Sequence, residues 1–149
     1  MDHRQPCSDD YLQGILKSVK TIAMVGASND KTKFSYGVIR VLSDTGYDMI
    51  PVNPLPGLEE IRGIKVYPSF AAIDRPVDLV EVFRRPEDLM EVAREAIEMR
   101  AKVLWGQIGV VDFDAARIAE NAGLKVVMDR CPKIELFRPF WKPKLHMGI

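Results

Sequence analysis

Two arginines and a glutamine follow predicted strands of this sequence, at positions where a parallel sheet collects groups that bind ligands. Arg84 and Arg85 come directly after the apolar run 79–83, and Gln107 follows another such run. Arginine binds phosphate through paired, charge-assisted hydrogen bonds, each of which contributes about 1.5–3 kcal/mol. We therefore expect at least one of the two arginines to serve an anionic ligand, and we expect Gln107 to contact it too.

A glycine ends the first strongly apolar run, residues 21–25. Gly26 permits a tight turn and a close approach of a ligand to the backbone, and a helix after it would offer free N–H groups to a phosphate. The loop is not a dinucleotide fingerprint, because Ser28 stands where the second glycine of G-x-G-x-x-G would be, and it is not a P-loop. The loop therefore predicts a phosphate site, but it also fits a surface turn in which a serine caps the helix.

The next predicted strand, residues 47–52, ends without an acidic residue. An NAD-binding Rossmann domain places an acid there, about 20 residues beyond its glycines, to bind the adenosine ribose. This chain has Asn53 and Pro54 instead. A carboxylate would repel a ribose that carries a phosphate, so a neutral asparagine opposite Lys31 and Lys33 suits a more anionic nucleotide. The alternative is that Asn53 and Pro54 only turn the chain.

The cysteines and histidines are too few and too scattered for a predicted catalytic or metal centre. A thiolate nucleophile needs an electropositive site and a base, but His3 and His146 lie at the two ends of the chain. We therefore interpret Cys131 as a small buried side chain. Cys7 and Cys131 form no zinc-binding spacing and no disulfide framework, so we expect no metal and two reduced thiols.

Alternating elements must position these residues. Compact apolar runs predict strands at 21–26, 47–52, 64–67, 79–83, 102–105 and 124–128. Apolar residues at helical spacing predict helices at 9–18, 36–42, 86–97 and 112–121, with Gly46 and Gly123 as helix ends and one further turn near Ala71. Strands that alternate with helices imply a Rossmann-like, doubly wound parallel sheet in three α/β/α layers. Such sheets bind ligands outside the carboxyl ends of their strands.

Composition limits the partners of this chain. Its 149 residues predict one domain over 1–149, with 1–10 and 142–149 as peripheral tails. The 21 basic and 21 acidic residues cancel, and no block of like charges exists, so nucleic acid is not an expected partner.

No apolar stretch approaches the roughly 20 residues that span a bilayer, and the N-terminus does not resemble a secretory signal. A cytoplasmic location is expected. The aromatic residues Phe137, Phe140 and Trp141 near the C-terminus could form an internal packing surface, or a contact with a second copy or a protein partner.

Five segments occur in the order found in a known family: 25–28, 51–54, 78–88, 105–109 and 122–131. They resemble the stand-alone CoA-binding domain proteins. These are similar in turn to the N-terminal CoA-binding domain of the succinyl-CoA synthetase alpha subunit and of the ADP-forming acyl-CoA synthetases. The likeness covers about residues 10–140.

The resemblance implies that coenzyme A is the ligand and suggests which residues hold it. The implied contacts are Gly26, Ala27 and Ser28 for the pyrophosphate; Val52, Asn53, Pro54 and Lys33 rather than Lys31 for the adenosine end; Phe83, Arg84, Arg85 and Pro86 along the same cleft; and Gln107 and Gly109 toward the pantetheine arm. The 3′-phosphate and diphosphate of CoA agree with the missing ribose-binding acid and the local cations.

The larger relatives catalyse through a phosphorylated histidine on a further domain and use a separate nucleotide-grasp module. A chain that ends at Ile149 leaves room for neither. We therefore expect a protein that binds CoA or acyl-CoA as a carrier, sensor or partner module, and no catalytic activity. The alternative is an NAD(P)-binding redox protein on the same fold. A lesser variant has Cys131 forming a mixed disulfide with CoA.

Overall fold

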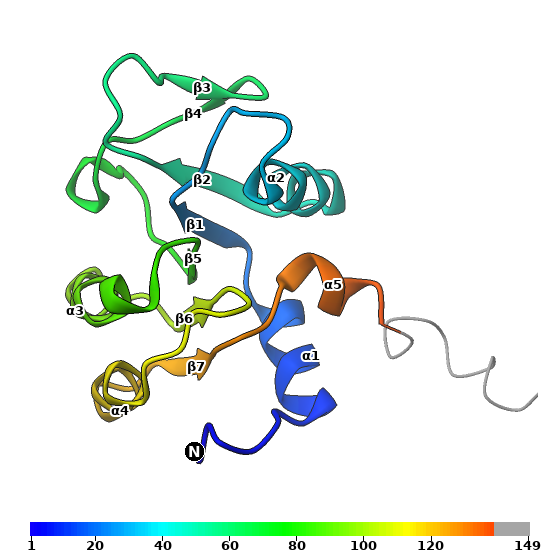
Figure 1. Ribbon diagram of the computed structural model, residues 1–149, viewed down its shortest axis with the longest axis vertical. Helices are drawn as coiled ribbons and strands as arrows, with labels where there is room; N and C mark the ends of the chain where they lie inside the picture. The colour runs from blue at the N-terminus through cyan, green and yellow to red at the C-terminus, as the bar shows by residue number, and fades with distance from the viewer. Residues whose placement is uncertain (139–149) are drawn as a thin grey trace, which may run out of the picture.

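The computed structural model describes residues 1–138 and shows the predicted parallel sheet. Its strands, in chain order, are β1 (Thr21–Val25), β2 (Asp48–Val52), β5 (Leu79–Val82), β6 (Val103–Gly106) and β7 (Lys125–Val127). They form one five-stranded sheet in the order β2-β1-β5-β6-β7, and all neighbours are parallel (Figure 1). The expected doubly wound, Rossmann-like fold is confirmed.

Helices cover both faces of the sheet, so the domain has three layers (Figure 1). One face carries α1 (Asp9–Ser18), α2 (Phe34–Thr45) and α5 (Pro132–Leu136), and the other carries α3 (Leu89–Glu98) and α4 (Phe113–Asn121). Each face has its own cluster of buried apolar side chains. The strands β5 and β6 are buried along their whole length, which explains why they appear in the sequence as continuous apolar runs.

The predicted helix ends are confirmed where the sequence carried a capping signal. The Asp112 side chain accepts hydrogen bonds from the amides of Asp114 and Ala115 at the start of α4. Gly46 ends α2 with a φ of 114°, a left-handed conformation that glycine adopts without strain. These caps set the positions at which the helices leave the sheet.

Three elements differ from the sequence-based prediction. The predicted strand 64–67 is shortened to β4 (Ile64–Lys65), and it pairs antiparallel with the unpredicted β3 (Glu60–Ile61) in a hairpin outside the main sheet. The helix α5 was also not predicted, although Pro132 occupies its first turn, where proline is favoured. The turn of helix expected near Ala71 is present as η1 (Phe70–Ala72).

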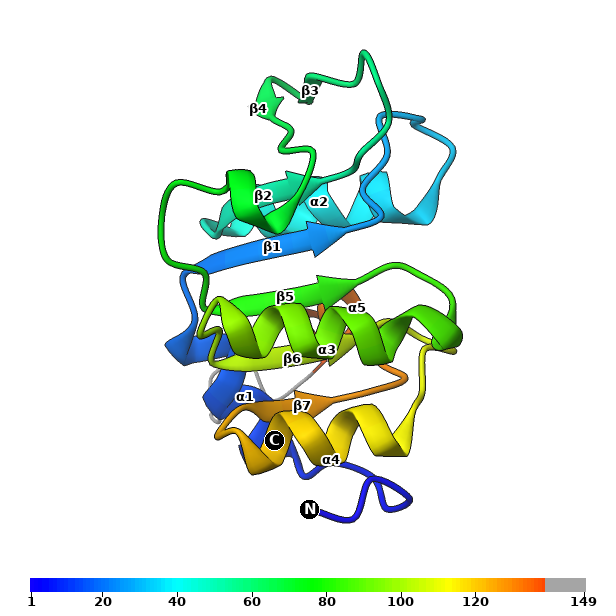
Figure 2. The ribbon, with the colours of Figure 1, turned by 90° about the vertical axis from the view of Figure 1, so that its left-hand side faces the viewer.

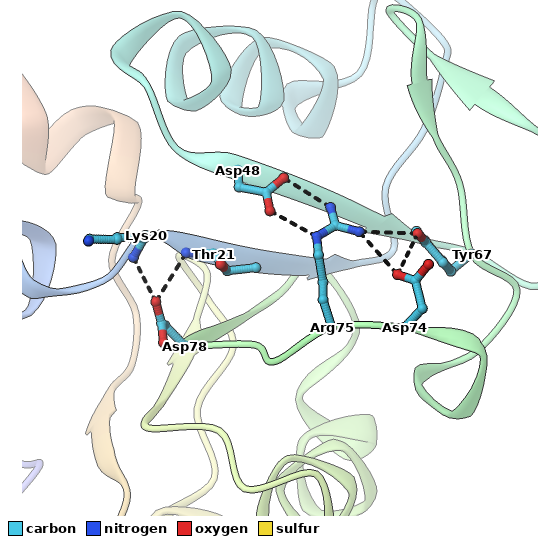
Figure 3. Close-up of polar contacts among 7 residues, drawn as sticks. All are labelled: Lys20, Thr21, Asp48, Tyr67, Asp74, Arg75 and Asp78. Carbon is cyan, nitrogen blue, oxygen red and sulfur yellow. Dashed lines mark hydrogen bonds and ion pairs between the residues drawn. The ribbon is translucent and has the colours of Figure 1, made fainter.

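The long connection between β2 and β5 is fastened to the amino-terminal edge of the sheet (Figure 3). Arg75 donates from Nε and Nη2 to the two carboxylate oxygens of Asp48, each at 2.9 Å, and from Nη1 to the Tyr67 hydroxyl at 3.1 Å. These hydrogen bonds raise the pKa of Arg75 above its ordinary value. The hairpin and η1 are thereby held against β2.

Asp78 makes a second fastening in the same region (Figure 3). Its Oδ2 accepts from the amides of Lys20 at 2.8 Å and Thr21 at 3.2 Å. Burial acts to raise the pKa of Asp78, but these amide hydrogen bonds, together with the hydrogen bond and charge of the Lys102 side chain, hold the pKa below the ordinary value. The starts of β1 and β5 are therefore aligned, as the register of Ile22 opposite Leu79 requires.

The segments near the chain ends were predicted to be peripheral. Before α1, His3 lies against α4, where its Nε2 is 2.9 Å from Glu120 Oε1 and its side chain is 5% exposed. Phe137 is 68% exposed. Phe140, Trp141 and the predicted tail 142–149 lie outside the described residues, so the apolar contact surface stays a prediction. Within residues 1–138, no helix has the length and hydrophobicity needed to span a membrane.

Candidate ligand-binding site

The carboxyl ends of the sheet strands lie at one edge of the domain, on the right in Figure 2. The chain runs from β1 through α2 to β2 on one side of β1, whereas β5, β6 and β7 lie on the other side. Strand order therefore reverses between β1 and β5. A doubly wound sheet opens a crevice for ligands at such a reversal.

Gly26 brings the two sides of this crevice into close contact. Its φ is 83°, and its amide donates to the Val52 carbonyl at 3.1 Å. A Cβ at this position would lie 2.1 Å from the Phe83 carbonyl oxygen and 3.2 Å from the Arg84 side chain. The tight turn expected at Gly26 is present, and only glycine fits both its conformation and its surroundings.

Side-chain hydrogen bonds within the loop after β1 hold its conformation. Ser28 Oγ accepts from the Asp30 amide at 3.1 Å, and Asp30 Oδ1 accepts from the Thr32 amide and hydroxyl. The expectation that a serine of this loop caps the helix is wrong, because Lys33 occupies the N-cap position of α2 and no side chain caps it. Lys33 is exposed there, and the first turn of α2 contains no acid and no side-chain cap. This helix end therefore offers N–H groups and a cation to the crevice.

Asn53 supports the turn of the chain after β2 through two side-chain hydrogen bonds. Its Nδ2 donates to the Ala27 carbonyl at 2.8 Å, and its Oδ1 accepts from the Leu55 amide at 2.9 Å. The Val52 side chain is buried. Asn53 and Pro54 also line a cleft of about 540 Å³ between the loop after β2 and the β3–β4 hairpin. Asn53 thus joins the loops after β1 and β2.

The two arginines lie at a second cleft, of about 480 Å³, beyond β5. Its lining residues come from the loops after β5 and β6: Phe83, Arg84, Arg85, Asp88, Gln107, Ile108 and Val110. The Phe83 ring lies 6.4 Å from the Phe34 ring at the start of α2, which connects this cleft to the loop after β1. Pro86 starts the 3₁₀ turn η2 (Pro86–Asp88), is exposed, and is not among the lining residues.

The loop after β6 presents a buried amide to the same cleft. Gln107 is 5% exposed, and its Oε1 has no hydrogen-bond partner among residues 1–138. The Gln107 carbonyl accepts from the Val110 amide at 2.8 Å. Gly109 has a φ of 84°, and its amide donates to Asp129 Oδ1 at 2.7 Å. Asp129, which follows β7, therefore holds this loop in place.

Glu81 is a residue that the sequence-based reasoning missed. It lies in the middle of β5, opposite Met24 of β1 and Trp105 of β6, and is fully buried. Neither carboxyl oxygen has a hydrogen-bond partner among the described residues. Burial, and to a lesser extent the nearby Cys131, raise the pKa of Glu81 well above its ordinary value. An acid inside an otherwise apolar strand was the available signal.

The remaining candidates are structural. Cys131 is 1% exposed, so its interpretation as a small buried side chain is confirmed, and Trp105 is fully buried. The Trp105 indole donates to the Arg130 carbonyl at 2.8 Å. Burial raises the pKa of the Cys7 thiol, although the Arg130 charge opposes this effect. Across residues 1–138, no three His, Cys, Asp or Glu side chains come together as metal ligands would.

The fold and this edge define a class: a Rossmann-like α/β domain with two open clefts and cationic side chains at the carboxyl ends of its strands. A family model described as a CoA binding domain matches residues 20–136, and the chain belongs to that family. The predicted resemblance is thereby confirmed.

Three relatives show the range of proteins that contain this domain. An uncharacterized protein from Bacillus subtilis, YneT, is 41% identical over 123 residues, which are 83% of this chain and 90% of that protein. An ADP-forming acetate–CoA ligase from Methanocaldococcus jannaschii is 32% identical over 130 residues, or 82% of this chain and 18% of the ligase. A solved hypothetical protein from Pyrococcus horikoshii superposes with a TM-score of 0.83 and 36% identity, covering 91% of this chain and 96% of that one.

Proposed function

We propose that this chain is a cytoplasmic protein that binds coenzyme A or acyl-CoA at the carboxyl edge of its sheet. The observation that carries the proposal is the reversal of strand order between β1 and β5, in a chain whose residues 20–136 match a CoA-binding domain. Lys33 and the free helix end of α2 lie on one side of it, and Arg84 and Arg85 lie on the other. These groups suit a ligand with a diphosphate and a further phosphate.

The two clefts suggest which part of an extended ligand each of them holds. The adenosine end fits the larger cleft at Asn53 and Pro54, and the pantetheine arm fits the cleft lined by Phe83 and Gln107. Gly26 lies between them, where the diphosphate would pass. The unpartnered Gln107 Oε1 is buried, but a change of side-chain rotamer would bring it to the surface of this cleft, where it could accept a hydrogen bond from an amide of the pantetheine arm.

The same geometry favours binding without catalysis. Cys131 is buried, and His3 is bonded to Glu120 on α4. Neither lies free at the crevice as a nucleophile or base would. We therefore propose a carrier, sensor or partner module, which delivers CoA or responds to it. A mixed disulfide at Cys131 would require the loop before α5 to open.

Isothermal titration calorimetry with CoA, 3′-dephospho-CoA and NADP⁺ tests this proposal. We expect one CoA site per chain and an affinity for 3′-dephospho-CoA that is about ten- to a hundredfold lower, because one charge-assisted contact to phosphate is lost. NADP⁺ should bind more weakly than CoA. Tighter binding of NADP⁺ would favour a redox protein instead, and an absence of heat with CoA would refute the proposal.

A further inference from the structure

A carboxylate lies between the two arginines of the second cleft. Asp88 Oδ2 is 3.3 Å from Arg84 Nε and 3.5 Å from Arg85 Nε. The 3₁₀ turn η2 produces this arrangement, because the Asp88 amide donates to the Arg85 carbonyl at 2.9 Å and so returns the side chain toward the arginines. Asp88 lines the same cleft as both arginines and Gln107. A negative charge is therefore built into the cationic side of the site.

Asp88 lies in the first helical turn after Arg85, where an acid interacts favourably with the helix dipole, but this position does not require its side chain to contact the arginines. Asp88 occupies the N-cap position of α3, but its side chain makes no capping hydrogen bond there. Partial burial acts to raise its pKa, but the hydrogen bond and charge of Arg85 and the charge of Arg84 outweigh this and hold the pKa below the ordinary value. The carboxylate is thus ionised at neutral pH, and it interacts with the two arginines.

The Asp88 carboxylate could affect an anionic ligand in two opposite ways. It could orient the arginines for the ligand, or it could compete with the ligand for them and repel it. The side chains of Arg84 and Arg85 are 41% and 73% exposed, and exposed ion pairs of this kind change an equilibrium constant by less than about fivefold. Repulsion between two charges about 4 Å apart amounts to roughly fivefold even in bulk water, and grows as a ligand displaces water. We therefore expect competition to be the larger effect once the ligand displaces water from the cleft.

We propose that the Asp88 carboxylate competes with the anionic groups of the ligand for Arg84 and Arg85. This competition sets the affinity and selectivity of the arginine side of the cleft. This inference rests on the proposed binding of CoA. A ligand with a strongly charged phosphate group displaces the carboxylate from the arginines, whereas a weakly anionic ligand does not. The arginines are then available mainly to polyphosphorylated ligands.

The substitution Asp88→Asn tests this role with little change in shape. The Asp88 side chain makes no capping hydrogen bond, and asparagine has nearly the same shape, so we expect α3 to fold normally apart from the small effect of one charge lost near a helix N-terminus. Asp114→Asn is the matched control, because Asp114 also lies in the first turn of a helix and pairs with an arginine, Arg117, at 3.0 Å. It removes the same unit of charge and is not among the residues that line the cleft.

Calorimetric titration of the three proteins with CoA and with inorganic pyrophosphate gives the result. We expect Asp88→Asn to bind both probes about five- to twentyfold more tightly than the wild type, and Asp114→Asn to stay within about twofold. Wild-type binding of CoA with no gain in Asp88→Asn would overturn the competitor role and leave the proposed function standing.

Other outcomes separate the two proposals further. If the wild type binds no CoA but Asp88→Asn gains affinity for pyrophosphate, the competitor role is supported and the proposed function fails. If none of the three proteins binds either probe, both are overturned. Equal gains in Asp88→Asn and Asp114→Asn would assign the effect to net charge and would also overturn the role of Asp88.

Discussion

Replacing Gly26 by alanine is expected to abolish CoA binding and to lower the free energy of unfolding by about 3 kcal/mol or more. Two effects add at this position. A non-glycine residue at a φ of 83° costs about 1–2 kcal/mol. The new Cβ would also lie 2.1 Å from the Phe83 carbonyl oxygen, which belongs to the backbone and cannot rotate away.

The clash at Gly26 also explains the effect on binding. The alanine fits only if the end of β1 and the start of the loop after β5 move apart. The loop after β1 forms one side of the crevice, and the loop that carries Phe83 and Arg84 forms the other. That movement separates the two sides. A displacement of about 1 Å in a preorganised site is enough to lose most of its affinity.

Gly123→Ala is the matched control for Gly26→Ala. Gly123 has a φ of 97°, but no atom lies within 4 Å of the Cβ that alanine would add. It precedes β7, at the opposite edge of the sheet from the crevice. We expect a loss of about 1–2 kcal/mol in urea unfolding and unchanged CoA binding. Equal losses of stability in the two variants would show that the close approach to Phe83 is unimportant.

Replacing Glu81 by methionine is expected to raise the free energy of unfolding by about 2–4 kcal/mol at pH 8. The Glu81 carboxyl is fully buried, and neither oxygen has a partner among residues 1–138. Methionine has a similar volume and no polar group to desolvate, so it should pack between Met24 and Trp105 without this cost.

The effect of Glu81 on the free energy of unfolding depends on pH in a defined direction. Burial raises the pKa of Glu81 in the folded protein, whereas in the unfolded chain it is about 4.3. Below that value the carboxyl is protonated in both states. Above it the unfolded chain releases the proton and the folded protein retains it, so the folded state loses about 1.4 kcal/mol of stability per pH unit until the raised pKa is reached.

Urea unfolding of the wild type and Glu81→Gln at several pH values from 5 upward measures this slope. Glutamine cannot ionise, so the stability of the wild type relative to Glu81→Gln should fall steadily with pH. Glu98→Gln, which removes an exposed glutamate of α3, controls for the lost charge. A constant difference between the wild type and Glu81→Gln across this range would show that Glu81 is not a buried neutral acid.

Much of the fold could be predicted because its signals are local. Apolar runs marked the central strands, and Asp112 and Gly46 marked helix ends, because capping and burial act over a few residues. The hairpin partner β3 was missed since two residues carry no periodicity. The short helix α5 was missed although Pro132 marked its start.

The site could be predicted in position but not in its internal contacts. Residues after strands meet at one edge of a parallel sheet, so Arg84 and Gln107 could be assigned to one cleft before any contact was known. The bond from Asn53 to Ala27 spans 26 residues, and no local pattern indicates it. The approach of Gly26 to Phe83 likewise depends on the packing of β1 against β5.

The most direct measurement of the central claim is a titration of the ¹⁵N-labelled protein with CoA, followed by its amide chemical shifts. We predict that the largest changes fall on residues 26–28, 53, 83–85 and 107–109, at the carboxyl edge of the sheet. The opposite edge also has a cationic cleft, of about 440 Å³, which includes Lys102 and Lys125. Changes confined to that cleft, or none at saturating CoA, would contradict the account.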